Sequence, residues 1–356
     1  MNLKRIFILV SIAFMGISVS AQDMHFSQYY ASPLTLNPAL TGKFNGLWRV
    51  SAIYRDQWRN IQEQKTNTFM TPSVSVDFSL LKNKLKNSAL GVGLVATYDK
   101  VGAFNTIDAG LSLAYHLGLD KKGKYHLALG FQGLYSNRKL DADFTFEDQL
   151  VLGLSESQDI NLLDTKAHHI FDLGAGMLFD AKIGKNSTFY AGYSANHILQ
   201  PKNDFIANAT GDEDARIPLR HVAHLGAEIG VKRVIVIPGA LFQTTVNTNE
   251  INFGLTVGYK VIDKPKKTTA IFLGLWSRMH INDEPISAAI IPKIGIDFEN
   301  FRLSGAYDIG LGQIAKDSKS ATNVNKLPTA FEIAVSYFGQ GKTPVPANTY
   351  LFNPRF

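Results

Sequence analysis

The residue types that most often carry chemistry are sparse in this chain, and their spacing gives no catalytic or metal-binding arrangement. The sequence has no cysteine, which excludes disulfides, thiolate metal sites and a cysteine nucleophile. His221 and His224 are three residues apart, so on a strand they point to opposite faces and cannot share a metal ion. The adjacent His168 and His169 diverge for the same reason. Because no serine occupies a nucleophile elbow and no convincing carboxylate pair is present, we predict no enzyme activity and no cofactor.

Two further groups have a chemical interpretation and a simpler one. Gly91–Gly93 and Gly174–Gly176 faintly resemble dinucleotide-binding loops, but no strand–turn–helix context follows. Glycine at alternate strand positions more often makes room inside a barrel or lets a strand bend. The acidic run Asp212–Asp214 lies in a long predicted loop and could bind Ca²⁺ together with Asp204, although a solvated acidic loop is the favoured interpretation.

The elements that must position these residues are strands, because most of the chain after Leu47 alternates between apolar and small or polar residues. In Ala89–Tyr98 this period of two extends over ten residues, the length of a tilted membrane-spanning strand. Similar segments predict about fourteen strands, over residues 47–58, 66–79, 88–99, 104–118, 123–136, 167–182, 187–198, 218–232, 233–246, 249–261, 268–280, 285–297, 300–312 and 327–338.

The lengths of the connections indicate how these strands are arranged. Every second connection is short, whereas the others include the long segments 138–166, 199–217 and 313–326. Short turns on one side and long loops on the other are typical of outer-membrane barrels, and an even strand number suits closure. We therefore predict an all-β fold, a transmembrane antiparallel β-barrel of about 14 strands over residues 47–338 in the cell outer membrane. A soluble β-sandwich would need polar residues where these strands carry Leu, Phe and Tyr.

The predicted short turns are mostly basic, with Lys82, Lys84 and Lys86 in one of them and Lys121, Lys122 and Lys124 in another. Ordinary solvated turns are the favoured interpretation. The alternative is a positively charged rim that docks an acidic periplasmic partner. The formal charge of +6 is modest and the lysines lie in short turns, so nucleic acid is not a predicted partner.

The ends of the chain differ from the barrel. Residues 1–21 have Lys4 and Arg5 before a short apolar run, followed by small residues, and predict a secretory signal peptide. Residues 22–46 form an irregular head, aromatic at first and then interrupted by Pro33 and Pro38. Residues 339–356 form a proline-containing tail. Both head and tail are candidates either to plug the lumen or to lie in the periplasm.

One long loop is unusually apolar for a segment that should face the exterior. It either folds inward to cap the lumen or presents a binding surface, and the second is favoured. Its apolar residues are Phe144, Phe146, Leu150, Val151 and Leu152.

The head and the last residues of the chain resemble the PorP/SprF family, outer-membrane proteins of the type IX secretion and gliding machinery of Bacteroidetes. Family members usually have a cysteine before the final proline, where this chain has Asn353, so any role of that thiol is absent. The residues that carry the resemblance are Gln22, Asp23, Phe26, Ser27, Gln28, Pro33, Asn37, Pro38, Ala39, Gly42, Arg49, Tyr54, Arg55, Gln57 and Trp58, with Pro354, Arg355 and Phe356 at the end.

The resemblance implies a non-enzymatic barrel that supports secretion of cargo with type IX C-terminal domains and anchors that cargo at the cell surface. The implied partners are the cargo, through its C-terminal domain, periplasmic components of the machinery, and outer-membrane lipid. The apolar long loop would then be the candidate cargo-binding loop. The head would either contact a periplasmic partner or plug the lumen, with Arg49 or Arg55 pairing with inward-facing acids. The alternative function is a channel or hydrophobic-substrate transporter resembling fatty-acid transport barrels.

Overall fold

The protein was analysed as a computed structural model, in which β-strands account for most of the chain. The structure describes residues 24–60, 69–82, 85, 87–102, 104–140, 167–184, 186–203, 215–246, 248–264, 267–281, 287–312 and 327–340.

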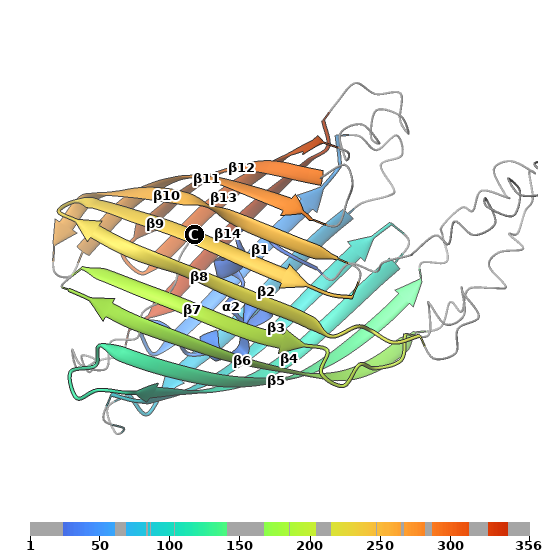
Figure 1. Cartoon of the computed structure of the whole chain (residues 1–356), viewed down its shortest axis with the longest axis horizontal. Helices are drawn as coiled ribbons and strands as arrows, with labels where there is room; N and C mark the ends of the chain where they lie inside the picture. The colour runs from blue at the N-terminus through green and yellow to red at the C-terminus, as the bar shows by residue number, and fades with distance from the viewer. Residues whose placement is uncertain are drawn as a thin grey trace, which may run out of the picture.

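Fourteen strands form one closed barrel, as predicted (Figure 1). Each strand pairs with its neighbours in sequence, and the antiparallel ladder between β1 and β14, from Trp48↔Gly339 to Gln57↔Ala330, closes the ring. The strands are β1 (Trp48–Gln57), β2 (Phe69–Leu80), β3 (Ala89–Val101), β4 (Phe104–Gly118), β5 (Tyr125–Leu140), β6 (His168–Ile183), β7 (Ser187–Asn196), β8 (Arg220–Val231), β9 (Val234–Thr244), β10 (Asn249–Lys264), β11 (Lys267–His280), β12 (Ser287–Phe298), β13 (Phe301–Gly312) and β14 (Thr329–Gly339).

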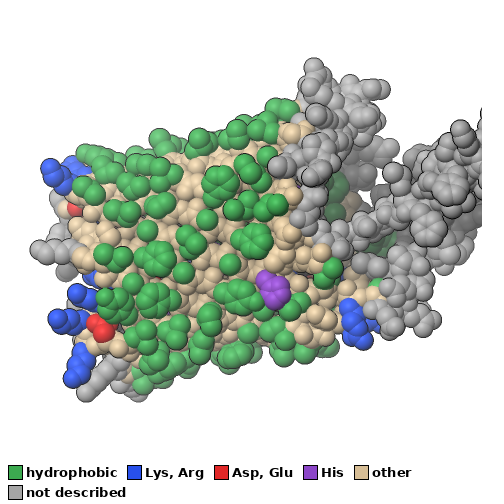
Figure 2. Space-filling view, viewed as in Figure 1, with side chains coloured by type: hydrophobic (Ala, Val, Ile, Leu, Met, Phe, Trp, Pro, Cys, Tyr) green, Lys and Arg blue, Asp and Glu red, His purple; other side chains and the backbone are tan. Residues whose placement is uncertain are grey.

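The period of two in the sequence separates a lipid-facing wall from the lumen. On β3 the Leu94 side chain is 55% exposed, whereas Val95 and Thr97 on the alternate positions are buried. On β13, Leu303 is exposed and Asp308 is buried. Figure 2 shows hydrophobic side chains spread over the outer wall between the two ends of the barrel. This outward apolar band is what a barrel presents to the hydrocarbon of a membrane.

The two rims of the barrel differ as the sequence predicts. The connections β2–β3, β4–β5, β6–β7, β8–β9, β10–β11 and β12–β13 are short and meet at one rim, while the long connections β5–β6, β7–β8 and β13–β14 meet at the other. Short turns face the periplasm in outer-membrane barrels, so we call these the inner rim and the outer rim. Lys and Arg side chains gather at the inner rim, at the left of Figure 2.

Several strands extend beyond their predicted ends because pairing with a neighbour continues. β5 runs to Leu140, which lies opposite Phe104 of β4, so Arg138 and Lys139 belong to the wall and not to the following loop. β10 likewise continues to Lys264 through a register shift after Lys260. Where a strand ends depends on how far its neighbour continues to pair with it, and the residue pattern of one strand alone says little about this.

The chain before β1 contains short helical turns. They are η1 (Tyr29–Ala31), α2 (Pro33–Leu36) and η2 (Pro38–Leu40). In the part of the chain that the structure describes, no helix is both long and apolar enough to cross a membrane. All of these turns lie inside the ring of strands, where Figure 1 shows α2.

Candidate functional site

The head, residues 24–46, folds into short turns because its prolines fit the start of each. Pro33 is the first residue of α2 and Pro38 the first of η2, positions where a missing backbone N–H removes no helical hydrogen bond. The Asn37 side-chain oxygen accepts a hydrogen bond from the backbone N–H of Ala39 at 2.9 Å and caps η2. The prolines and Asn37 of the head therefore favour a series of short helical turns.

Aromatic and aliphatic residues of the head form the core of the lumen. The ring of Tyr29 lies edge-on to Trp276 of β11 with centroids 5.8 Å apart, and Tyr30 lies edge-on to Tyr190 of β7 at 5.5 Å. Leu40 and other buried head residues belong to the same cluster as inward-facing residues of the wall. The head is thus packed against the barrel from within.

Glycines on the lumen side let the head approach the wall. A Cβ at Gly130 of β5 would lie 2.3 Å from the backbone nitrogen of Ala39, and one at Gly91 of β3 would lie 2.0 Å from the Thr41 carbonyl oxygen. A Cβ at Gly176 of β6 would lie 2.0 Å from the Asn37 side-chain oxygen. Real Cβ atoms do not approach other atoms so closely, so these glycines are required by the head.

Ser27 is the best-connected residue of the head, and all of its polar groups bind inward-facing side chains. Its backbone N–H donates to Glu332 of β14 at 2.6 Å, and the N–H of Gln28 donates to the second oxygen of that carboxylate at 2.8 Å. Its hydroxyl donates to Asp308 of β13 at 2.7 Å and accepts from Arg55 of β1 at 2.9 Å. Arg55 also pairs with both carboxylates.

Two further cations complete this cluster from neighbouring strands. Arg278 of β11 donates to the Ser27 hydroxyl at 3.0 Å and to Asp308 at 2.8 Å. Lys293 of β12 donates to the Ser27 carbonyl oxygen at 2.7 Å. These charges are buried, so each must be compensated inside the lumen. We call Ser27, Arg55, Arg278, Lys293, Asp308 and Glu332 the outer latch.

Asn37 fixes the middle of the head. Its side-chain nitrogen donates to the carbonyl oxygens of Met177 at 3.1 Å and Tyr193 at 3.3 Å, and it lies 3.0 Å from the His224 Nε2 atom. The Nδ1 atom of the same histidine shares a hydrogen bond of 3.0 Å with the Tyr30 hydroxyl. His224 therefore acts as a packed core histidine.

A second set of contacts holds the end of the head that leads into β1. Asp77 of β2 accepts from the Gly42 N–H at 2.7 Å and from two guanidinium nitrogens of Arg49, at 2.9 and 2.7 Å. Lys43 pairs with Asp180 of β6 in the buried interior. We call Gly42, Lys43, Arg49, Asp77 and Asp180 the inner latch.

Lys82, in the turn after β2, ties the junction between head and barrel to the inner rim. Its ammonium donates to the carbonyl oxygens of Phe44 at 2.6 Å and Gly46 at 2.8 Å. Burial, and after it the nearby charge of Lys43, lower the pKa of Lys82 to about 7. The sequence pattern groups Lys82 with the solvated turn lysines, and this interpretation is wrong.

The head runs along the lumen from one rim to the other. The Met24 carbonyl oxygen lies 3.4 Å from Arg220 at the start of β8, and His25 lies 3.7 Å from Glu250 at the start of β10. Both strands start at the outer rim. Gly42 contacts the inner ends of β2 and β3, where a Cβ would meet Phe78 and Gly91. The amino end of the head is therefore directed toward the outer rim.

The remaining residues of the head motif lie at the junction with β1 or pack in the lumen. Phe26 packs against Ile53 and Ala334. Trp58 directly follows β1 at the outer rim, and the centroid of its ring lies 5.2 Å from that of Phe69. Tyr54 and Gln57 belong to β1. The other predicted site residues lie outside the described residues. They are Gln22 and Asp23 of the head, Asp204 with Asp212–Asp214, the loop residues Phe144, Phe146, Leu150, Val151 and Leu152, and Pro354, Arg355 and Phe356 at the end of the chain.

Sequence reasoning missed the wall partners of the head. Asp77, Asp180, Arg278, Lys293 and Glu332 are spread over five strands. Each is a charged residue on the buried face of its strand, and on β11 that face also carries the large side chains of Phe272 and Trp276. That signal marks the lumen side, but it does not tell which charges come together. Within the described ranges, no three His, Asp or Glu residues are arranged to hold a metal ion.

The fold is similar to solved barrels of outer membranes. The structure of the CymD monoaromatic hydrocarbon channel has 9% sequence identity and a TM-score of 0.50, and the match covers 90% of this chain and 96% of that one. A Pseudomonas aeruginosa FadL homologue has 10% identity and a TM-score of 0.47, and the match covers 85% and 92%. At such identities the likeness concerns the fold alone. A search of curated proteins gives no match.

The family comparison covers nearly all of the chain. The family described as type IX secretion system membrane protein PorP/SprF matches residues 18–337, which include the head and the barrel. This match and the barrel fold place the protein in the outer membrane. The chain belongs to the PorP/SprF family of type IX secretion system membrane proteins.

Proposed function

We propose that the protein is a non-catalytic outer-membrane component of the type IX machinery that supports secretion of a cargo protein and anchors it at the cell surface through its C-terminal domain. The observation that carries this proposal, together with family membership, is the buried head locked in the lumen by the outer and inner latches. A barrel filled in this way offers its rims, and not its interior, as working surfaces.

The two rims suit different partners. The outer rim carries the long connections, which would meet cargo outside the cell. The inner rim carries exposed lysines such as Lys121, Lys122 and Lys124, which would attract an acidic periplasmic component. Lys82 does not take part, because its ammonium is bound by the head.

The alternative function is a channel for hydrophobic substrates. The fold shared with hydrocarbon channels is compatible with it. The position of the head argues against a channel, because Tyr29, Tyr30 and Asn37 occupy the middle of the lumen and contact several strands. Conductance in planar bilayers separates the two functions. A sealed barrel supports anchoring, whereas steady ion or solute flux through the intact protein supports a channel.

The direct test is purification from native outer membrane after mild crosslinking, followed by identification of the proteins recovered. We expect a large secreted protein crosslinked through its C-terminal domain, with or without periplasmic subunits. Point substitutions in the connections β5–β6 and β7–β8 should reduce that crosslink, whereas Leu273→Ala on the lipid-facing wall should not. Recovery of the barrel alone would contradict the proposal.

A further inference from the structure

The ladder of backbone hydrogen bonds around the barrel is interrupted between β6 and β7 at the outer rim. β6 pairs with β5 from its first residue, His168, whereas its pairing with β7 starts only at Ala175, opposite Ala195. On the β7 side of β6, no described strand continues the ladder opposite residues 168–174. β6 therefore extends further toward the outside than its neighbour.

A turn directly after β7 leads the chain away from β6. His197 has a φ of 61°, in the left-handed region that is unfavourable for a residue with a Cβ. The buried carboxylate of Asp172 on β6 holds this turn, because it forms a hydrogen bond with the His197 ring and accepts one from the Leu199 N–H at 3.3 Å. The interruption is thus fixed by specific side-chain contacts.

Two residues of β6 have backbone groups that face the interruption. The Leu173 carbonyl oxygen accepts from the Ile198 N–H at 3.0 Å, and the Leu173 N–H donates to Asp172 at 2.7 Å, so the backbone groups of Leu173 lie on the β7 side and are paired. Because a strand directs every second residue to the same side, the N–H and C=O groups of Phe171 and His169 also lie there. No segment of the described chain pairs with them. We call Phe171 and His169 the β6 edge.

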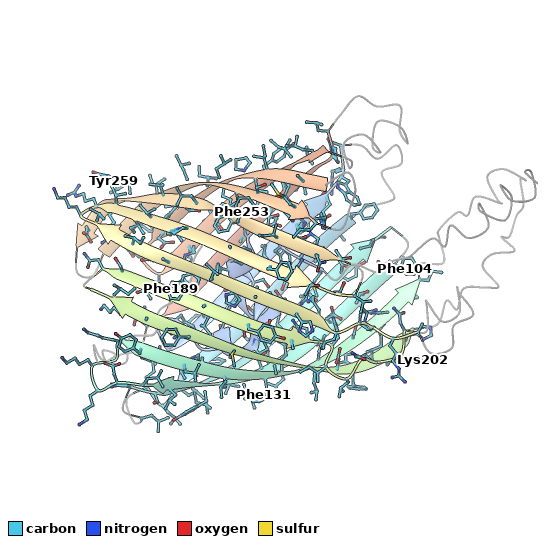
Figure 3. The ribbon with its side chains drawn as sticks, viewed as in Figure 1. Phe104, Phe131, Phe189, Lys202, Phe253 and Tyr259 are labelled. Atoms are coloured by element: carbon cyan, nitrogen blue, oxygen red, sulfur yellow. The ribbon has the colours of Figure 1, made fainter. Side chains whose placement is uncertain are left out.

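The β6 edge lies where the membrane meets the outer rim. The His169 Nδ1 atom shares a hydrogen bond of 2.7 Å with the Tyr135 hydroxyl, and amphipathic rings of this kind mark the membrane interface. Phe171 lies two residues closer to the middle of the wall. Figure 3 labels Lys202, further along the connection after β7, at the end of the barrel opposite to Tyr259. Because water becomes scarce at this depth, unpaired N–H and C=O groups favour a partner that can form hydrogen bonds.

The surroundings of the β6 edge fit one extended peptide segment with apolar side chains. Phe171, Ile198 and Leu199 are 69%, 43% and 52% exposed. Hydrogen bonds between strands lie in the plane of the sheet, so the backbone groups of the edge point along the wall and not out of it. A second barrel would meet the face of the wall, whereas a single extended segment can lie along the edge.

We propose that the β6 edge binds an extended segment of the cargo's C-terminal domain by adding it as a strand. Backbone hydrogen bonds to His169 and Phe171 hold the segment, and its apolar side chains pack on Phe171, Ile198 and Leu199. This inference rests on the proposed function and gives the cargo a binding site.

The test uses the full chain in lipid nanodiscs, with the cargo that native crosslinking identifies as the probe. Phe171→Pro removes an N–H of the β6 edge but no hydrogen bond to β5, and Phe171→Ala removes the ring but keeps the N–H. The matched control is Phe131→Ala on β5, which Figure 3 labels. Phe131 is 68% exposed, and β5 is paired with a strand on both sides of it.

We expect Phe171→Pro to bind the cargo at least about tenfold more weakly than the parent, because a backbone hydrogen bond and the apolar packing are both lost. Phe171→Ala should lose less affinity, and Phe131→Ala should bind like the parent. Equal binding by Phe171→Pro and the parent would overturn the β6 edge and leave the proposed function standing. No binding by the parent would contradict the proposed function and the β6 edge with it.

Hydrogen exchange tests the β6 edge without any substitution. The amides of His169 and Phe171 should exchange quickly in the protein alone and slowly with bound cargo, as measured by mass spectrometry of peptides that cover residues 168–174. Slow exchange in the protein alone would show that the chain itself pairs the edge. Protection that increases with the concentration of the protein alone would identify a second copy as the occupant. Either result, or exchange unchanged by bound cargo, would overturn the proposal.

Discussion

At the scale of single residues, the head is held by a few buried polar side chains rather than by surface pairs. Ser27 uses its N–H, hydroxyl and carbonyl oxygen, and each has a partner on a strand. Arg55 connects Ser27 with Asp308 and Glu332 and is 1% exposed. A buried charge without its partner is far more costly than a lost surface ion pair.

We therefore expect Arg55→Leu to destabilise the barrel by about 3–5 kcal/mol, because two buried carboxylates lose their shared cation. The measurement is the temperature at which the heated protein loses its folded mobility in a cold detergent gel. Lys260→Leu is the control, since Lys260 and Asp263 form a surface pair at 3.6 Å and should contribute about 0–1 kcal/mol. Equal midpoints for Arg55→Leu and the parent would contradict the outer latch.

Lys82 gives a prediction about pH. Burial lowers the pKa of Lys82 to about 7 from its ordinary value of 10.5, so between these values the unfolded chain binds more protons than the folded one. Lys82 therefore makes the free energy of unfolding rise as the pH increases from about 7 to 10.5.

We expect the difference in unfolding free energy between the parent and Lys82→Met to be larger near pH 9.5 than near pH 6.5, as measured by denaturant titration in detergent at about these two pH values. Lys121→Met, at an exposed turn position, should show no such trend. A difference that shrinks as the pH rises would contradict the buried position of Lys82.

At the scale of elements, the strands were predictable and the turns of the head were not. Strands β3, β10, β13 and β14 alternate with a period of two. Because one face of such a strand contacts lipid and the other the lumen, the sequence alone indicates which residues point inward. The helices of the head have three or four residues, too few to form alone. They form because the wall surrounds them, and that wall is assembled from residues up to 305 positions away, as Ser27 and Glu332 show.

The inward glycines give a prediction at this scale. We expect Gly130→Leu to expel the head, because a Cβ there would lie 2.3 Å from the Ala39 nitrogen. The chain has no cysteine, so Ala39→Cys can report the position of the head through its reaction with a small maleimide. This cysteine should be unreactive alone and reactive together with Gly130→Leu.

Gly133→Leu is the matched control for this experiment. It lies three residues along the same strand, and a Cβ there meets no atom within 4 Å. The Ala39 cysteine should stay unreactive in that background. Equal reactivity in both backgrounds would show that the substitution loosens the barrel in general and would contradict a specific cradle for the head.

At the scale of the whole molecule, closure, strand number and the difference between the rims followed from the sequence, but the place of the head did not. An inward-facing polar or glycine residue fits a water-filled lumen as well as a plugged one, so composition leaves the choice open. The positions of Arg49 and Arg55 suggest inward pairing, yet the acids Asp77, Asp308 and Glu332 become partners only once the ring of strands has closed.

The path of the head predicts at which rim its amino end is accessible. Met24 lies beside Arg220 at the outer rim, while residues 42–46 lie at the inner rim, so the head crosses the whole lumen. We expect Met24→Cys to react with a membrane-impermeant maleimide on intact cells. Val246→Cys, in the β9–β10 connection and 80% exposed, is the positive control, and Lys232→Cys in the β8–β9 turn should react only after the outer membrane is permeabilised. If Met24→Cys behaves like Lys232→Cys, the amino end faces the periplasm and the direction of the head is reversed. If it behaves like Val246→Cys, the same segment that packs inside the lumen also reaches the surface where cargo would be held.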